Sequence, residues 1–227
     1  MSKITELIAR MRDLPEKEKR ATQLGEMVAV RDKLATAAEK SDRLRTLSAS
    51  LENVDGADFV AKAKLGLTQA ATTANGLKKR FEIGTGFERK RADDALTLIN
   101  ERLENASAGI AKGWRALIDD QARRYRPLAD AATKAALSGG AGLTDAIDRL
   151  EGWRESPPQS AQAATAYQFD AARLPASIAS LGLEGRAGKF MIDASNGRAR
   201  AKDLQDPNVI AFLDEHPAVW AMLKVGL

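Results

Sequence analysis

FVAKAKLGLTQAATTANGLKKRF, residues 59–81, carries the most regular apolar pattern in the chain. Its apolar side chains recur at alternating spacings of three and four residues, which is the repeat of a helix face that packs against other helices. Small and large residues share this face, so a partner helix can approach closely. The face consists of Val60, Ala63, Leu67, Ala70, Ala74, Leu77 and Phe81.

Two further helical patterns flank this stretch. The first runs from about residue 16 to 52 without a proline, and the turn sequence NVDGAD (53–58) ends it. Its predicted apolar face consists of Leu24, Met27, Val30, Leu34, Ala38, Leu44, Leu47 and Leu51. The second pattern starts near Phe87 or Glu88. Its face consists of Leu96, Ile99, Leu103, Ala106, Ile110, Trp114, Leu117, Ile118, Tyr125 and Leu128.

Two irregularities mark this last helix. The apolar spacing slips between Ile110 and Trp114, which predicts a local unwinding of a supercoil. Pro127 predicts a kink or a break at Tyr125 or Arg126, because proline lacks the backbone donor and clashes with the preceding turn.

The chain as a whole is predicted to be all-α, with a boundary at SGGAG (138–142). Residues 1–138 are expected to form an antiparallel coiled-coil arm, either a long helical hairpin or a three-helix coiled coil. Residues 143–227 are expected to form a small compact helical C-terminal domain, because short helical patterns and tight turns follow one another there.

The composition agrees with long helices rather than a thick core. Apolar residues make up 44% of the 227, but 42 of them are alanines, and aromatic residues reach only 5%. Alanine has the highest helix propensity and buries little area. No cysteine is present, which excludes disulfides, thiolate metal sites and thiol catalysis. We see no secretory signal and no membrane span, so we expect a cytoplasmic protein of bacterial type.

No catalytic grouping is recognisable. The single histidine, His216, precedes a proline between two helical segments and is read as a cap or loop residue. The pairs Asp93-Asp94 and Asp119-Asp120 lie on predicted helices, where neighbouring side chains point in different directions. GTG at 84–86 matches neither nucleotide-binding fingerprint. We therefore expect a non-enzyme with no catalytic, cofactor-binding or metal residues and no cofactor.

The densest positive charge lies at KKRFEIGTGFERKR, residues 78–91. In an antiparallel hairpin this segment is the tip, and its cations are Lys78, Lys79, Arg80, Arg89, Lys90 and Arg91. Such a tip can bind a nucleic-acid backbone without reading bases. The alternative is ordinary solubilising charge, with Phe81 and Phe87 closing the helical seam.

Two smaller basic clusters have the same two interpretations. Arg123, Arg124 and Arg126 stand beside Tyr125, either as nucleic-acid contacts or as exposed arginines at a structural kink. NGRARAK (196–202) holds three cations and no acid in a predicted loop. Near the C-terminus, large apolar residues are too numerous for one narrow helix face. Some belong to the core, and the candidates for docking a partner are Phe212, Trp220, Met222 and Leu223.

Two functional hypotheses follow. The first is a non-enzymatic accessory or scaffold subunit of a larger bacterial assembly, which binds a protein partner or self-associates through the coiled-coil arm and docks through its C-terminal domain. The alternative is a nucleic-acid-backbone-binding accessory factor of a DNA- or RNA-handling complex, such as a defence or restriction complex, acting through the basic tip at residues 78–91.

Overall fold

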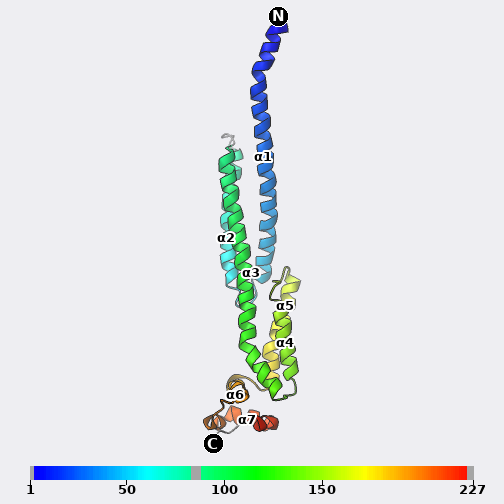
Figure 1. Ribbon diagram of the computed structural model, residues 1–227, viewed down its shortest axis with the longest axis vertical. Helices are drawn as coiled ribbons and strands as arrows, with labels where there is room; N and C mark the ends of the chain where they lie inside the picture. Colours follow the sequence, from blue (N-terminus) through cyan, green and yellow to red (C-terminus); the bar gives the residue numbers. More distant parts are fainter. Residues whose placement is uncertain (1–2, 83–87, 224–227) are drawn as a thin grey trace. The chain divides into compact units, whose positions relative to one another are not determined.

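The fold was examined in a computed structural model that describes residues 3–82 and 88–223, with the side chains of residues 18–79, 88–220 and 223. The structure is 83% helical, and the described residues form no strand, so the all-α prediction is confirmed. The elements are α1 (Lys3–Leu51), α2 (Phe59–Glu82), α3 (Arg89–Lys134), α4 (Gly140–Gly152), α5 (Ala161–Ser180), α6 (Gly185–Ser195), η1 (Ala201–Gln205), α7 (Pro207–Glu215) and η2 (Pro217–Met222) (Figure 1).

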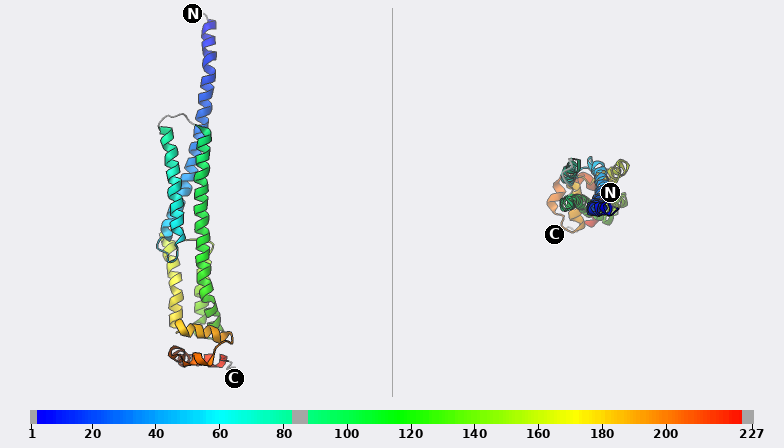
Figure 2. Two further views of the ribbon diagram at one scale, coloured as in Figure 1. Left: turned by 90° about the vertical axis from the view of Figure 1, so that its left-hand side faces the viewer. Right: turned by 90° about the horizontal axis from the view of Figure 1, so that it is seen from above.

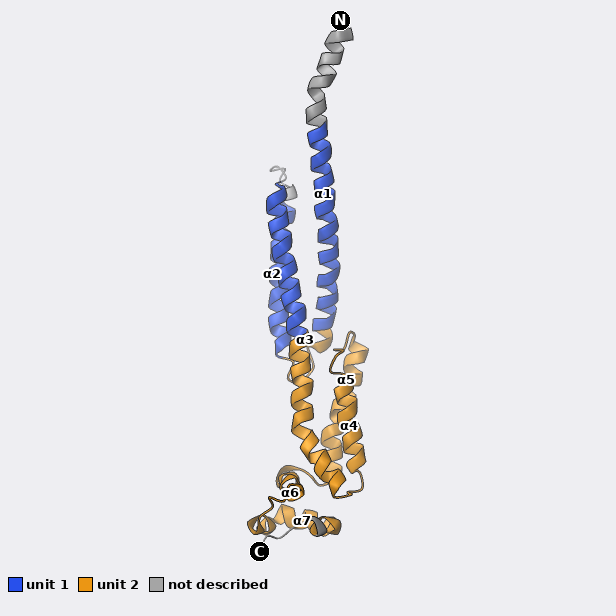
Figure 3. Ribbon diagram, in the orientation of Figure 1, with its two compact units in different colours: residues 1–48, 58–110 blue, residues 49–57, 111–227 orange. Residues whose placement is uncertain are grey.

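These elements form two compact units, drawn in different colours in Figure 3. Unit 1 comprises residues 1–48 and 58–110, and unit 2 comprises residues 49–57 and 111–227. Residues 111–138, which the sequence analysis assigned to the arm, therefore pack within unit 2. The coiled-coil description of the arm stays a prediction.

Unit 1 is a three-helix arrangement in which α1, α2 and the first half of α3 bury a shared seam. Side chains from all three helices form one cluster around Val30, Leu77 and Leu96. Every described member of the face predicted for α2 is buried or half-buried. Helix α2 lies close to α3 at Gly66, where an added Cβ would make ordinary contact with the Cβ of Ala106 at 3.5 Å.

The register of α1 differs from the prediction. Val30, Ala37 and Leu44 are buried at intervals of seven residues, whereas Ala38 is exposed. Leu24 and Met27 are also exposed rather than part of the seam. In Figure 3 the described part of α1 continues past the described end of α2.

Helix α3 contributes to the cores of both units. Its buried residues alternate by three and four up to Ile110, after which Trp114, Ile118 and Ala122 follow at intervals of four. The predicted slip in spacing thus coincides with the division between the units, and an unwound supercoil stays a prediction. Pro127 does not break the helix, which continues to Lys134 while its ribbon bends toward that end (Figure 1). Four buried residues after the proline hold the last turns in place: Leu128, Ala129, Ala131 and Ala132.

The core of unit 2 is organised around three aromatic residues. The rings of Trp114 and Tyr167 meet edge to face with centroids 4.8 Å apart, and Trp153 lies 6.1 Å from Tyr167. The Trp114 Nε1–H donates to the Trp153 carbonyl over 2.7 Å, and the Trp153 Nε1–H donates to the Asp170 carboxylate over 2.9 Å. These bonds satisfy the indole donors of Trp114 and Trp153 and join α3, α4 and α5.

The end of the chain forms a layer of short helices, α6, η1, α7 and η2, seen from two further directions in Figure 2. Asp206 caps α7 by accepting from the Asn208 N–H over 2.9 Å, and Pro207 occupies the first helical position. The apolar sides of α6 and α7 are buried through Phe190, Met191 and Leu213. None of the helices in the described ranges is both long and apolar enough to cross a membrane.

Candidate anion-binding cavity and the predicted basic clusters

The structure describes the predicted basic tip in part. Residues 83–87 and the side chains of Arg80, Phe81 and Phe87 lie outside the described residues. Arg89 donates to Asp93 over 2.6 Å and lies 4.0 Å from Glu26 on α1. Arg91 pairs with Glu88 over 2.7 Å. Among the tip cations whose side chains are described, Arg89 and Arg91 are thus paired with acids of unit 1.

The charges around Arg89 serve helix packing. The hydrogen bond from Arg89 is the main reason why the pKa of the Asp93 carboxyl lies below its usual range, and Lys33 on α1 adds to this from 3.4 Å. Asp93 is therefore bound to a cation of α3 and a cation of α1. Of the Asp93-Asp94 pair, Asp93 makes a contact between helices, and Asp94 is exposed to solvent.

The arginines of residues 123–126 are also largely engaged. Arg126 donates to Asp148 over 2.9 Å and to Glu151 over 2.7 Å, so it joins α3 to α4. These bonds raise the pKa of the Arg126 guanidinium above its ordinary value, the bond to Glu151 most. Arg124 pairs with Asp120 one turn earlier, and Arg123 is exposed. A structural interpretation fits Arg126 best.

The predicted docking residues whose side chains are described do not share one surface. Phe212 is buried, with its ring centroid 4.7 Å from that of His216, so it belongs to the core of unit 2. Trp220 is 48% exposed and Leu223 is half-buried. The side chain of Met222 lies outside the described residues. Only Trp220 presents a large exposed apolar surface among those described.

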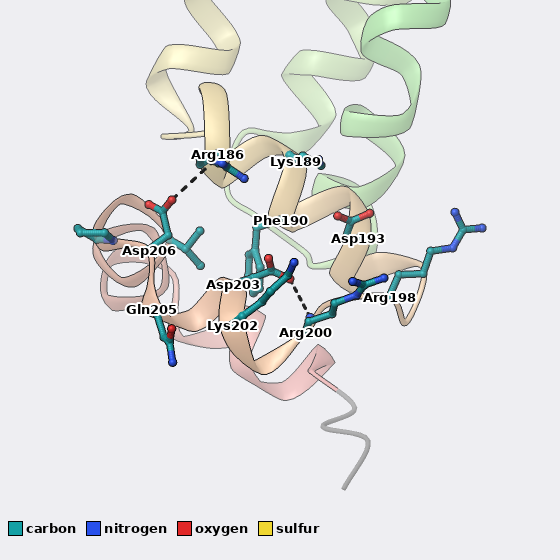
Figure 4. Close-up of a pocket in the computed structure, with 12 residues that line it drawn as sticks. Arg186, Lys189, Phe190, Asp193, Arg198, Arg200, Lys202, Asp203, Gln205 and Asp206 are labelled. Atoms are coloured by element: carbon teal, nitrogen blue, oxygen red, sulfur yellow. Dashed lines mark hydrogen bonds and ion pairs between the residues drawn. The ribbon is translucent and has the colours of Figure 1, made fainter.

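A cluster of exposed positive charge lies around a cavity of about 710 Å³ in unit 2. Helix α6, the segment at 196–200, η1 and α7 surround it (Figure 4). Its cationic residues are Arg186, Lys189, Arg198, Arg200 and Lys202, and its acidic residues are Asp193, Asp203 and Asp206.

Local structure brings these cations together. Arg186, Lys189 and Asp193 are spaced by three and four residues, which places them on one face of α6; Phe190 is buried at the border of this face and Met191 on the opposite side. Helix α6 then ends in a glycine turn. The Gly197 N–H donates to the Ala194 carbonyl over 3.0 Å, and the Arg198 N–H to the Asp193 carbonyl over 2.7 Å. This is the hydrogen-bond pattern of a Schellman motif, with Gly197 at a φ of +68°.

The turn reverses the chain, so residues 198–202 return beside α6. Two of the three acids that line the cavity accept hydrogen bonds from backbone amides: Asp203 accepts from the Arg200 N–H over 2.8 Å, and Asp206 caps α7. Arg186 approaches Asp206 at 3.9 Å. Lys189, Arg198 and Lys202 make no ion pair within the described part of the chain.

Sequence reasoning identified some of the cationic residues that line this cavity and missed others. The run at 196–202 was recognised as basic, but Arg186 and Lys189 were missed because glycines and apolar residues separate them in the sequence. Their spacing of three on an amphipathic helix was the available signal. No group of three or more His, Asp or Glu side chains that could hold a metal ion occurs among the described residues.

Comparison with known proteins gave no relative. No protein-family model matches the chain, and no curated protein or solved structure is significantly similar to it. The proposals below therefore rest on the residues and their geometry.

Proposed function

We propose that this protein is a non-enzymatic accessory or scaffold subunit of a larger assembly, and that α1 binds an amphipathic helix of a partner protein. The observation that carries the proposal is an uncovered apolar face on α1. Leu24, Met27 and Val28 are 63%, 38% and 40% exposed. Their spacing of i, i+3 and i+4 places all three on the same side of the helix.

This face has the features of a helix-binding surface. Peptide helices that dock on a helical surface use anchors at i, i+3 and i+4, and an apolar patch with a polar rim marks an interaction site. Charged residues of both signs border it, among them Arg31 and Asp32. Such a rim suits an amphipathic helix with mixed charge beside its apolar face. We call Leu24, Met27 and Val28 the α1 apolar face.

Site-specific crosslinking tests this proposal. A photo-crosslinking amino acid at position 24, introduced in the organism that encodes the protein, is expected to trap one defined partner protein, identifiable by mass spectrometry. Met27→Glu with Val28→Glu should abolish the crosslink, because two carboxylates would be buried without partners at the interface. The matched control is a crosslinker at Leu65, an isolated apolar residue of α2 that is 60% exposed.

The outcomes separate the alternatives. Crosslinks that join only two copies of this chain, together with a dimer by light scattering, would replace the heterologous partner by self-association. Equal crosslinking from positions 24 and 65, or a crosslink that survives the double substitution, would reject the α1 apolar face as the binding surface.

A further inference from the structure

We propose that the cavity of unit 2 binds a ligand with two or more neighbouring phosphate groups. This site is independent of the α1 apolar face and differs from the basic tip predicted from the sequence. Five cations from α6, the following turn and η1 surround one cavity, against three carboxylates (Figure 4). The lining therefore carries a net charge of +2, half of the +4 of the whole chain.

Most of the cations in the lining are not paired with its carboxylates. Asp203 and Asp206 accept hydrogen bonds from the Arg200 and Asn208 backbone amides, so part of their acceptor capacity is already used. Of the five cations, only Arg186 forms an ion pair with a described residue, and at 3.9 Å that pair is loose. Several guanidinium and ammonium donors remain for a ligand.

A second basic cavity of unit 2 has fewer cationic donors available for a ligand. It is lined by Arg123, Arg126 and Lys134. Arg126 is held by two carboxylates of α4, and Lys134 donates to the Ser195 carbonyl over 3.1 Å. Only Arg123 is left to meet a ligand there, so that cavity is a weaker candidate.

The chemistry of the lining favours phosphates. Arginine and lysine donors are the usual partners of phosphate oxygens, and a single carboxylate ligand would leave most of the five cations unpaired. Phe190 and Val209 line the cavity but are buried, so no aromatic face is available for stacking a base. Recognition would depend on charge and not on base identity.

Two sources present such phosphates. A free oligophosphate fits because about 710 Å³ lies within the usual range of small-molecule pockets. A single nucleic-acid strand presents the same groups along its backbone. The experiment therefore uses one probe of each kind.

The test compares two charge-matched variants. The cavity variant is Lys189→Gln, Arg198→Gln and Lys202→Gln, and the tip variant is Lys78→Gln, Lys79→Gln and Lys90→Gln. Each removes three exposed charges and takes the net charge from +4 to +1. Binding of sodium tripolyphosphate is measured by calorimetry, and binding of fluorescein-labelled 12-mer oligo(dT) and oligo(dA) by anisotropy. Circular dichroism verifies that each variant is folded.

We expect the cavity variant to lose binding and the tip variant to retain it. For a single strand, three lost phosphate contacts reduce the slope of log K against log salt by about 2, which corresponds to about 100-fold weaker binding at 0.1 M salt. Oligo(dT) and oligo(dA) should bind alike. Binding of tripolyphosphate alone would identify a small-molecule site, and binding of the oligonucleotides alone a strand site.

Two results would overturn the proposal. One is that neither probe binds the wild-type protein. The other is that the tip variant weakens binding as much as the cavity variant, which would assign the effect to net charge or to the tip. Arg198→Glu alone provides an independent check, since reversing one charge in the cavity should weaken binding more than reversing Lys79 in the tip.

Discussion

At the residue scale, Tyr167 shows how a buried polar side chain is accommodated in unit 2. The residue is 2% exposed, its ring packs against Trp114 and Trp153, and its hydroxyl donates to the Gln121 Oε1 over 3.3 Å. Burial raises the pKa of this hydroxyl above its ordinary value of 10.0. The ring belongs to the core, while the hydroxyl depends on one long hydrogen bond.

This burial makes stability depend on alkaline pH. Above about pH 10 the unfolded tyrosine releases its proton while the folded one retains it, so the free energy of unfolding falls as pH rises toward the folded pKa. Tyr167→Phe should remove this part of the decline and lower stability at pH 7 by only about 0.5 kcal/mol. Urea unfolding at pH 7, 9, 10 and 11 provides the comparison. Parallel losses in both proteins would show that burial does not shift this pKa.

At the element scale, two helical glycines differ in the space available for a side chain. Gly66 on α2 leaves room for a Cβ, since the nearest atoms, on Ala106 and Arg102, would lie 3.5 and 3.6 Å away. Gly188 on α6 leaves none, because a Cβ there would lie 2.3 Å from the Leu183 carbonyl oxygen. The first glycine is a replaceable spacer, and the second is required for the α5–α6 turn to pack.

Alanine substitutions test this difference. Gly66→Ala should stabilise the protein by about 0.5–1 kcal/mol, because alanine loses less backbone entropy in a helix and makes ordinary contacts here. Gly188→Ala should destabilise it by about 2 kcal/mol or more, because a backbone carbonyl must move. Chemical denaturation measures both. A stabilising Gly188→Ala would mean that α6 packs less closely than described.

At the scale of the whole molecule, α3 is the element that both units share. It supplies Leu103 and Ile110 to the core of unit 1 and Trp114 and Ile118 to the core of unit 2, all of them fully buried. The helix continues without interruption from one set to the other. Damage to α3 near residue 111 should therefore reach both cores.

Lys112→Pro tests this dependence. Proline removes the N–H of residue 112 and clashes with the preceding turn, which costs about 3 kcal/mol in a helix interior. Amide hydrogen exchange should accelerate on both sides, in residues 96–110 and 114–122. Lys112→Ala, at the same exposed position, should change the free energy of unfolding by less than about 0.5 kcal/mol. Faster exchange in only one unit would show that the two cores are stabilised independently of the helix.

The sequence by itself determined the helices and most of their buried faces, because these depend on local spacing and propensity. The stripe of α2 from Val60 to Leu77 was predicted residue by residue, and the slip after Ile110 was located from spacing alone. The basic run at 196–202 was likewise visible as composition.

Tertiary structure decided which of these features meet. Ala37 rather than Ala38 is buried because it lies seven residues from both Val30 and Leu44, on the side of α1 that packs against the other helices. Arg126 is neutralised because α4 presents Asp148 and Glu151 to it, whereas Arg89 pairs mainly with Asp93 of its own helix. Arg186 and Lys189 join residues 198–202 only because a glycine turn folds the chain back beside α6. Local spacing fixes which face of a helix is apolar and which charges pair within one helix, but the meeting of charged side chains from distant segments depends on the tertiary fold.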